Sequence, residues 1–393
     1  MKLVLAHQDE LQRRLATLRE TPISPENDPW DPYATVGLAD KPLLTSIEVT
    51  VTNLCNLRCE HCAVGDVLTD TEQRAFPLDD LMARLDEVDT LVTFSVTGGE
   101  PAASQRLVDE VTRPLLQYAK ARGLRTQVNT NLTLPLERYE SFIDLVDVLH
   151  VSYNYPEPAE FARIAYAYSD RVPKDPTALL RRMERNIREL SAAGRFVSAE
   201  TILTRATLPR IEEIHARIAE LGCRRHEIHP LYPSDFAARM SVPALEEYAD
   251  GVRRLLATRN PEVWILFGTF PFFACSPDPT HRQLLAHVLA QPNTTVRNDP
   301  DGRNRLNVSS LTGDVLVADF ASLGPVGNIG REGFQAIWER WLASQTAARI
   351  HCHCPAARCL GPNIIVAETY FPGVDWHARE AAMGAGRGLV RPT

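Results

Sequence analysis

Strand-like apolar runs alternate with amphipathic helical segments over most of the chain, and this alternation limits the possible fold more than any other feature. Runs rich in Val, Ile and Leu predict strands at residues 46–52, 91–97, 125–130, 146–152, 197–203, 227–231 and 263–268. We interpret most of them as continuous apolar runs, which are typical of parallel strands covered on both faces. Repeated strand–helix units predict a parallel α/β sheet, either open or curled into a barrel.

The helices between these strands have clear boundary signals. Asp175 and Pro176 predict a helix start, and Gly194 lies just beyond the predicted end. Apolar side chains recur at helical spacing in residues 179–190 and again in residues 211–221. We interpret both stripes as the faces that pack on the sheet.

The chain divides into four predicted segments. Residues 1–42 are polar and rich in proline, and predict a short helix followed by an extended arm. Residues 43–270 hold the repeated strand–helix units. The pattern then changes to a β-hairpin around Gly313, a helix and a cysteine-dense stretch, which predicts a second, smaller domain at residues 271–375. Residues 376–393 are predicted to be a tail, rich in glycine and arginine at its end.

Composition and hydropathy exclude several classes of partner. The 393 residues include 42 Lys and Arg against 50 Asp and Glu, a net charge of −8, which argues against a nucleic-acid backbone as the partner. The longest apolar stretch, residues 263–275, contains Gly268 and Pro271 and is too short for a membrane span, which needs about 20 residues. No signal peptide is recognisable, so we expect a cytoplasmic protein. In that reducing compartment, eight cysteines indicate metal binding or catalysis rather than disulfides.

Three cysteines follow the first predicted strand directly. Cys55, Cys59 and Cys62 form a CxxxCxxC spacing on the first strand–helix loop. This loop lies at the carboxyl end of the sheet, where α/β proteins bind ligands. Three thiolates at this spacing can hold a [4Fe–4S] cluster and leave its fourth iron without a protein ligand. The alternative is a zinc site with His61 as fourth ligand, although zinc cysteines usually come in CxxC pairs.

An open iron suits the chemistry of S-adenosylmethionine (SAM). The amino and carboxylate groups of SAM can chelate that iron, and the cluster can pass one electron into the sulfonium. The carbon–sulfur bond then breaks and yields a 5′-deoxyadenosyl radical. On this interpretation Cys55, Cys59 and Cys62 are catalytic residues as well as metal ligands.

A glycine pair ends the second predicted strand. Residues 95–101 read Ser-Val-Thr-Gly-Gly-Glu-Pro, and Gly-Gly alone would indicate only a turn. Downstream of CxxxCxxC, however, this segment resembles the radical SAM superfamily, over roughly residues 46–270. The resemblance implies a partial (β/α)6 barrel. The expected fold is therefore α/β, with a radical SAM barrel followed by a small C-terminal auxiliary iron–sulfur domain.

The resemblance also implies which residues bind SAM. In the superfamily a GGEP-type loop contacts the SAM amino group, and the matching residues are Gly98, Gly99, Glu100 and Pro101. The residue before the third cysteine packs near the adenine, and here it is His61. Small polar residues at strand ends often bind the ribose or the carboxylate, and the candidates are Asn131, Ser152 and Asn154. The alternative for these three is that they cap the turns that follow.

A second group of cysteines lies in the C-terminal third of the chain. Cys352, Cys354 and Cys359 form a CxCxxxxC spacing, and Cys275 would complete a set of four thiolates. Four thiolates are enough for a second iron–sulfur cluster. The alternatives are a three-cysteine cluster with one iron open for substrate, and a zinc site completed by a histidine.

This C-terminal pattern refines the resemblance. Together with residues 27–30 (Asn-Asp-Pro-Trp) and 297–303 (Arg-Asn-Asp-Pro-Asp-Gly-Arg), it closely resembles the radical SAM/CxCxxxxC-motif family of the YfkAB type, which implies no particular reaction. The hairpin and residues 327–329 are also similar to SPASM/Twitch auxiliary domains. The sequence departs from those domains at Asp319, where they carry a cysteine.

Several remaining polar residues have two interpretations. Cys223 is either core packing or a hydrogen-atom donor to a substrate radical. Glu200 lies inside the fifth predicted strand, where a buried carboxylate needs a partner. A further set near a strand's carboxyl end consists of substrate contacts or of ordinary surface residues: His226, Glu227, His229, Tyr232 and Asp235.

Together these features predict a radical SAM enzyme with two metal centres. Its SAM would be cleaved at the first [4Fe–4S] cluster, and the radical would abstract a hydrogen atom from an unidentified small molecule or peptide. Oxidation, epimerisation and bond formation are all open as outcomes. We expect an electron donor such as flavodoxin or ferredoxin, and neither a nucleic-acid nor a membrane partner. The alternative is a non-catalytic iron–sulfur electron carrier or redox sensor.

Overall fold

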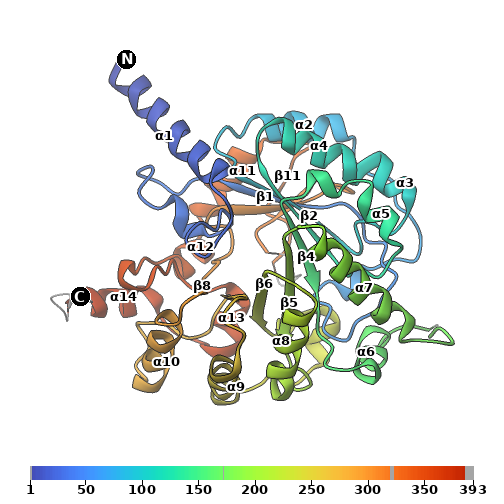
Figure 1. The fold of residues 1–393 in the computed structure, drawn as a ribbon. Coiled ribbons are helices and arrows are strands. Elements are labelled where there is room, and N and C mark those ends of the chain that lie inside the picture. The colour runs from blue at the N-terminus through green and yellow to red at the C-terminus, as the bar shows by residue number, and fades with distance from the viewer. Residues whose placement is uncertain (1, 171, 319–322, 386–393) are drawn as a thin grey trace.

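The strand-forming segments assemble into one sheet in the computed structural model, which describes residues 2–170, 172–318 and 323–385 (Figure 1). Its strands are β1 (Ser46–Thr50), β2 (Thr93–Thr97), β3 (Arg125–Thr130), β4 (Val148–Ser152), β5 (Val197–Leu203), β6 (Arg225–Pro230), β7 (Trp264–Gly268), β8 (Thr294–Arg297), β9 (Arg305–Ser309), β10 (Asp314–Leu316) and β11 (Gly327–Asn328). Their spatial order is β11-β10-β9-β1-β2-β3-β4-β5-β6-β7-β8. All neighbours from β9 to β8 run parallel, whereas β10 pairs antiparallel with β9 and β11.

Helices follow most strands and lie on the outer side of the curved sheet in Figure 1. They are α1 (Lys2–Glu20), α2 (Leu78–Asp86), α3 (Gln105–Leu107), α4 (Arg113–Ala121), α5 (Leu136–Glu140), α6 (Pro158–Ala165), α7 (Ala178–Ala192), α8 (Ile211–Glu220), α9 (Leu245–Thr258), α10 (Pro279–Leu289), α11 (Phe334–Leu342), α12 (Gln345–Ile350), α13 (Ile364–Tyr370) and α14 (Trp376–Ala385). Both predicted apolar stripes are confirmed, since Met183 and Ile187 of α7 and Ile214 and Ile218 of α8 are buried in the core.

The predicted strands agree with the structure to within a few residues, and those at 125–130 and 197–203 match it fully. The hairpin is also confirmed, because β9 and β10 pair around Gly313, whose φ of +74° suits glycine. Strand β8, four residues that extend the parallel sheet beyond β7, was not predicted from the sequence. Its short Thr-Thr-Val-Arg sequence gives almost no apolar signal.

The sheet continues past the predicted domain boundary at residue 270. Strand β8 adds to β7 at one edge, and β9 pairs in parallel with β1 at the other. Both strands come from the segment predicted to be a second domain, so this boundary falls within a continuous sheet. The predicted tail at residues 376–393 begins instead with helix α14, whose Trp376 is buried against the second cysteine group. Its last eight residues, and Asp319, lie outside the described residues.

The two faces of the parallel strands differ in chemistry. Outward residues such as Val197 and Ala199 of β5 join the apolar core beneath the helices. The alternate residues on the same strand are Ser198 and Glu200, and they contact polar side chains of neighbouring strands. The interpretation of these strands as continuous apolar runs is therefore wrong for β5, because successive side chains point to opposite faces and the inner face here is polar.

The N-terminal arm joins this inner face. Trp30 donates its indole N–H to Ser95 Oγ of β2 at 3.1 Å, and Asp28 accepts from Arg297 of β8 at 2.9 Å. Residues 27–30 and 297–303, which share the sequence resemblance, are therefore neighbours in space. Among the residues described, no helix is long and apolar enough to cross a membrane.

A buried pair of histidines links α8 to the outer face of β6. The backbone N–H of Asn260 donates to His215 Nε2 at 3.1 Å, so His215 keeps its proton on Nδ1. That proton is directed at His226 Nδ1, 3.0 Å away, and His226 Nε2 then donates to Thr201 Oγ1 at 2.9 Å. Burial lowers the pKa of His215 to about 4 and that of His226 well below its ordinary value.

This pair predicts a loss of stability in mild acid. Both imidazoles have a lower pKa folded than unfolded, so the unfolded chain binds more protons below about pH 6.5. The stabilisation is complete above that pH and is lost as the pH falls towards 4. We expect the denaturant midpoint of the wild type to fall from pH 7 to pH 5 more steeply than that of a His215→Leu/His226→Leu variant. Equal slopes for the two proteins would contradict this role.

Candidate iron–sulfur and SAM site

The first cysteine loop leaves β1 and is fixed by backbone contacts to distant segments. The N–H groups of Arg58 and Glu60 donate to the carbonyls of Ala165 and Ile164 at the end of α6, each at 3.0 Å. The N–H of Thr69 donates to the carbonyl of Asn53 at 2.8 Å, which closes the loop behind the cysteines. The loop thus holds its three thiols at the carboxyl end of the parallel strands, as predicted.

The three thiols of this loop lie close enough to influence one another. Burial raises the pKa of Cys55 to about 12 and that of Cys62 to about 11, and it raises the pKa of Cys59 well above its ordinary value. Cys59 also experiences both other cysteines as repulsive charges. Thiolates here therefore need cations to hold them, which is the role that metal ions play in thiolate sites. The all-sulfur donor set fits an iron–sulfur cluster.

The glycine pair allows the second loop to pack on the first. The N–H of Gly99 donates to Thr52 O at 2.7 Å, and that of Glu100 donates to Leu54 O at 2.8 Å. A Cβ on Gly98 would collide with Thr52 O, and one on Gly99 would collide with Leu54 O. Gly98 also has a φ of +145°, which disfavours any other residue. The Gly-Gly pair is thus explained by close contact with the cysteine loop.

Replacing Gly99 by alanine is expected to damage the first thiol site selectively. The new methyl group would meet backbone atoms of Leu54, which cannot rotate away, at an expected cost of about 1–3 kcal/mol. We expect iron bound after anaerobic reconstitution to fall in Gly99→Ala. Gly324→Ala is the matched control, because a Cβ there would meet nothing within 4 Å. Equal iron in both variants would show that this contact does not support the site.

Glu100 faces the protein rather than the open end of the sheet. Its fully buried carboxylate accepts from Thr130 Oγ1 at 2.8 Å and from the N–H groups of Asn131 and Ala102 at 2.8 and 3.1 Å. Burial raises its pKa to about 7, and these hydrogen bonds oppose the shift. Glu100 therefore joins its loop to the end of β3, which leaves backbone groups of residues 98–101 as the candidate contacts for SAM.

The other predicted SAM residues gather near the same loops. Asn131 donates to Asn56 Oδ1 at 2.9 Å and lies 3.9 Å from Cys55 Sγ. Asn154 Nδ2 lies 3.2 Å from His61 Nε2, and its Oδ1 accepts from the N–H of Ile202. Burial lowers the pKa of His61 to about 4, which keeps the ring neutral. Ser152, at the end of β4, is partly exposed.

The second cysteine group also comes together. Cys275, Cys352, Cys354 and Cys359 pack into one apolar cluster with Phe273 and Trp376. Burial raises the pKa of Cys359 to about 12, with further contributions from Cys275 and Cys354. The structure thus brings Cys275 to the CxCxxxxC loop across a sequence separation of 77 residues, counted as 352 minus 275. Whether these thiols hold a cluster stays a prediction.

Residues 298–301 support this second group. Asn298 donates to Cys359 Sγ at 3.4 Å, and the Asp301 carboxylate accepts from the N–H of Ile364 at 2.6 Å. Burial raises the pKa of Asp301 to about 7. The carbonyl of Asp301 lies 2.9 Å from His351 Nε2. The Asn-Asp-Pro-Asp segment therefore braces the loop that carries the cysteines.

The N-terminal arm contacts the same loop. Tyr33 OH lies 3.4 Å from His353 Nε2, and Asp31 accepts from Arg358 at 3.0 Å. The Arg358 guanidinium also lies over the Tyr33 ring, 4.7 Å from its centroid. One arm thus contacts both the inner face of the sheet and the second cysteine loop.

The zinc alternatives have no geometric support in the described part of the chain. No three His, Cys, Asp or Glu side chains there are arranged to hold a single metal ion. A cubane cluster places its thiolates on separate irons, so it does not require them to converge on one point. Cys223 is buried in the apolar core with neighbours such as Ile218 and Leu221, which favours packing over hydrogen-atom donation.

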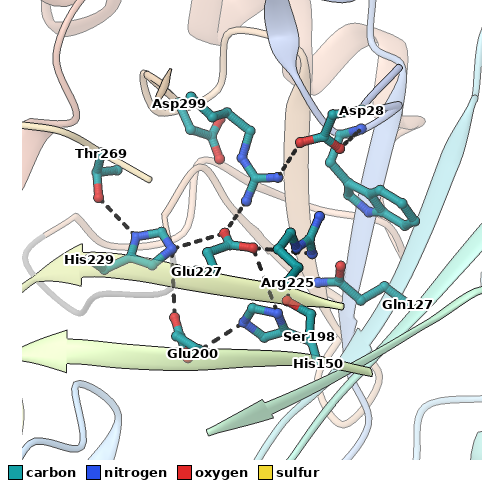
Figure 2. A network of polar contacts seen from close by, with 12 residues as sticks. Asp28, Gln127, His150, Ser198, Glu200, Arg225, Glu227, His229, Thr269 and Asp299 are labelled. Atoms are coloured by element: carbon teal, nitrogen blue, oxygen red, sulfur yellow. Dashed lines mark hydrogen bonds and ion pairs between the residues drawn. The ribbon is translucent and has the colours of Figure 1, made fainter. Parts of the chain in front are cut away.

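A buried polar network fills the inner face behind the first site (Figure 2). Glu227 of β6 lies at its centre, paired with Arg297, with Arg225 at 3.1 Å and with His229 at 3.0 Å. Glu227, His229 and Glu200 were candidates from the sequence, and Asp28 and Arg297 belong to the two segments that carry the family resemblance. Arg225 and His150 were not predicted. Alternating polar residues on each strand were the signal that could have found them. His226, by contrast, points outward into the histidine pair.

Comparisons with known proteins agree with this arrangement. Residues 49–195 match the radical SAM superfamily, and residues 231–381 match the YfkB-like domain. The chain is 47% identical over 363 residues to the YfkA protein of Bacillus subtilis (strain 168), covering 92% of this chain and 97% of that protein. It is 27% identical over 311 residues to an AdoMet-dependent heme synthase of Oleidesulfovibrio alaskensis (strain ATCC BAA-1058 / DSM 17464 / G20), covering 74% of this chain and 73% of that protein.

Solved structures share the fold at low sequence identity. A structure of anSMEcpe with bound AdoMet has a TM-score of 0.58 and 14% identity, covering 87% of this chain and 91% of that chain. Streptococcus suis SuiB bound to S-adenosylmethionine has a TM-score of 0.55 and 13% identity, covering 82% of this chain and 74% of that chain. In the complex of SuiB with the precursor peptide SuiA, the match spans 65% of the SuiB chain. These likenesses confirm the α/β barrel fold.

Proposed function

The chain belongs to the radical SAM superfamily and carries a YfkB-like C-terminal domain, and from this premise we propose that it is an enzyme that reductively cleaves SAM. The observation that carries the proposal is the meeting of three neighbouring thiols with the glycine-pair loop at the carboxyl end of the sheet. Cys55, Cys59 and Cys62 would hold a [4Fe–4S] cluster. When bound, this cluster supplies one electron that cleaves SAM to methionine and a 5′-deoxyadenosyl radical, which abstracts a hydrogen atom from the substrate.

The chain's own residues position SAM in this proposal. Backbone groups of Gly98 and Gly99 face the cysteine loop and bind the SAM amino group. Neutral His61, held by Asn154, offers an uncharged surface to the adenine. Asn131 and Ser152 are the candidates for the carboxylate and the ribose. Glu100 acts indirectly, by fixing the glycine loop to β3.

A second [4Fe–4S] cluster would be held by Cys275, Cys352, Cys354 and Cys359, and it would exchange electrons with the substrate. We propose a cytoplasmic setting with flavodoxin or ferredoxin as the donor, and a small molecule or peptide as the substrate. A non-catalytic electron carrier is the competing proposal, and it explains the four-thiol group as well as an enzyme does. It gives no reason for the three-thiol loop packed on the glycine pair.

The deciding experiment is a single-turnover assay on the anaerobically reconstituted chain. With dithionite and SAM, we expect 5′-deoxyadenosine and methionine to appear in equal amounts, because one bond cleavage yields both. A protein that binds iron and takes up electrons but forms no 5′-deoxyadenosine would be a carrier.

A further inference from the structure

The polar network of Figure 2 continues into a small pocket that is lined in part by Glu48, Asp299 and Arg305. Together they contain more carboxylates than guanidinium groups. The three guanidinium groups belong to Arg225, Arg297 and Arg305. The carboxylates belong to Asp28, Glu48, Glu200, Glu227 and Asp299. Three guanidinium groups thus stand beside five carboxylates, and the imidazoles of His150 and His229 each approach both Glu200 and Glu227. Buried negative charge of this kind requires a cationic partner.

The three guanidinium groups form their ion pairs with carboxylates other than Glu200. Arg297 pairs with Asp28 at 2.9 Å and also with Glu227, Arg225 approaches Glu227 at 3.1 Å, and Arg305 pairs with Asp299 at 3.1 Å. Among the residues described, the ion pairs of Glu200 are with imidazoles: His150 Nε2 at 3.6 Å and His229 Nε2 at 3.7 Å. Both distances exceed a normal hydrogen bond.

Glu200 is also the most exposed carboxylate of this group. Its side chain is 22% exposed, compared with 2% for Glu227, 7% for Asp28 and 17% for Asp299, and Asp299 is paired with Arg305. It lies beside the candidate SAM residues, because it pairs in register with Ser152 of β4, and Ile202, two positions further along β5, donates its N–H to Asn154, which lies 3.2 Å from His61. A ligand that arrives beside SAM therefore meets Glu200 first.

The two histidines that flank Glu200 have different surroundings. His229 Nδ1 lies 2.6 Å from Tyr232 OH and 3.0 Å from Thr269 Oγ1, so its Nε2 points at the carboxylates. Its ring lies over Gly268, where a Cβ would occupy the same space. His150 is 6% exposed, and its Nδ1 has no hydrogen-bond partner among the residues described. It lies 3.8 Å from Oε2 of Glu227, which Arg225 Nη2 approaches at 3.1 Å.

We propose that Glu200, flanked by His150 and His229, binds a cationic nitrogen of the substrate, either a primary ammonium or a guanidinium. This inference rests on the proposed function and names the substrate class for the same site. The ammonium would donate to the Glu200 carboxylate and to neighbouring acceptors, as a charge-assisted hydrogen bond. The group that loses its hydrogen atom would then lie between this anchor and SAM.

The test uses three small probes of matched size on the full reconstituted chain with SAM: n-butylammonium, butan-1-ol and butyrate. Dissociation constants from saturation-transfer NMR should favour n-butylammonium by at least about ten-fold over the other two. The Glu200→Gln change should weaken the binding of n-butylammonium by about ten-fold or more and leave the affinity for SAM unchanged. Glu220→Gln, on the exposed face of α8, is the matched control and should bind all three probes as the wild type does.

Equal affinities for the three probes, a preference for butyrate or an unchanged Glu200→Gln variant would each overturn the inference. The three-probe comparison needs only the wild type, so it stands even if the variant does not fold. Weaker SAM binding by a folded Glu200→Gln protein would instead assign Glu200 to the SAM site. Failure to form 5′-deoxyadenosine with ammonium binding intact would contradict the proposed function and not the cation site.

Discussion

Replacement of Cys55, Cys59 and Cys62 together by alanine is expected to reduce 5′-deoxyadenosine formation to the level seen without enzyme. The three thiols are the proposed ligands of the catalytic cluster and lie close enough for their charges to interact, so the triple change removes the whole set. The second thiol group is built from different segments, and so iron bound there should persist at about half the wild-type total of about eight per chain. Product analysis and iron determination on the same sample measure both effects.

Cys223→Ala is the matched control for this triple variant. It also removes a buried thiol, but from the apolar core beneath α8, and it should keep both iron sites and wild-type SAM cleavage. Continued formation of 5′-deoxyadenosine by the triple variant would show that SAM is cleaved elsewhere. Loss of all iron would show that the second group does not bind iron independently.

Much of the barrel could be predicted from local sequence patterns. Strands β3 and β5 match their predictions fully, because each is bounded by helical stripes with clear stop signals such as Gly194. Strand β8 was missed because four residues are too few for a periodic signal. Its place in the sheet is set by pairing with β7, which is a long-range contact. The same holds for β9, which local sequence cannot assign to β1.

The parts of the candidate site that could be predicted are those whose functional residues lie close together in the sequence. The three cysteines and the glycine pair are contiguous motifs, and the structure brings the two loops into contact. The inner network was not predictable in this way. His150, Arg225 and Arg297 come from three strands, and their meeting depends on the curvature of the sheet and on the arm that brings Asp28 to Arg297. Nor could spacing indicate that Glu100 would face β3.

Cys275→Ala gives the second large expected effect. Cys275 lies after β7, whereas Cys352, Cys354 and Cys359 follow α12, and all four share one apolar cluster in which their charges interact. If the four thiols hold one cluster, removing the Cys275 thiol should reduce the iron bound per chain from about eight to about four. Formation of 5′-deoxyadenosine should continue, because the first thiol loop makes no use of Cys275. Turnover of the physiological substrate should stop if the second cluster exchanges electrons with it.

Iron content and 5′-deoxyadenosine must be measured on the same preparation, because they separate the possible roles of Cys275. Full iron with unaltered spectroscopic signals would make Cys275 a packing residue and would favour the three-cysteine cluster. A wild-type protein with about four irons and one zinc would favour the zinc site instead. Loss of both iron and SAM cleavage would mean that the second group supports the barrel itself. That outcome is physically conceivable, since residues 298–301 join β8 to the second loop and Arg297 joins β8 to the inner network.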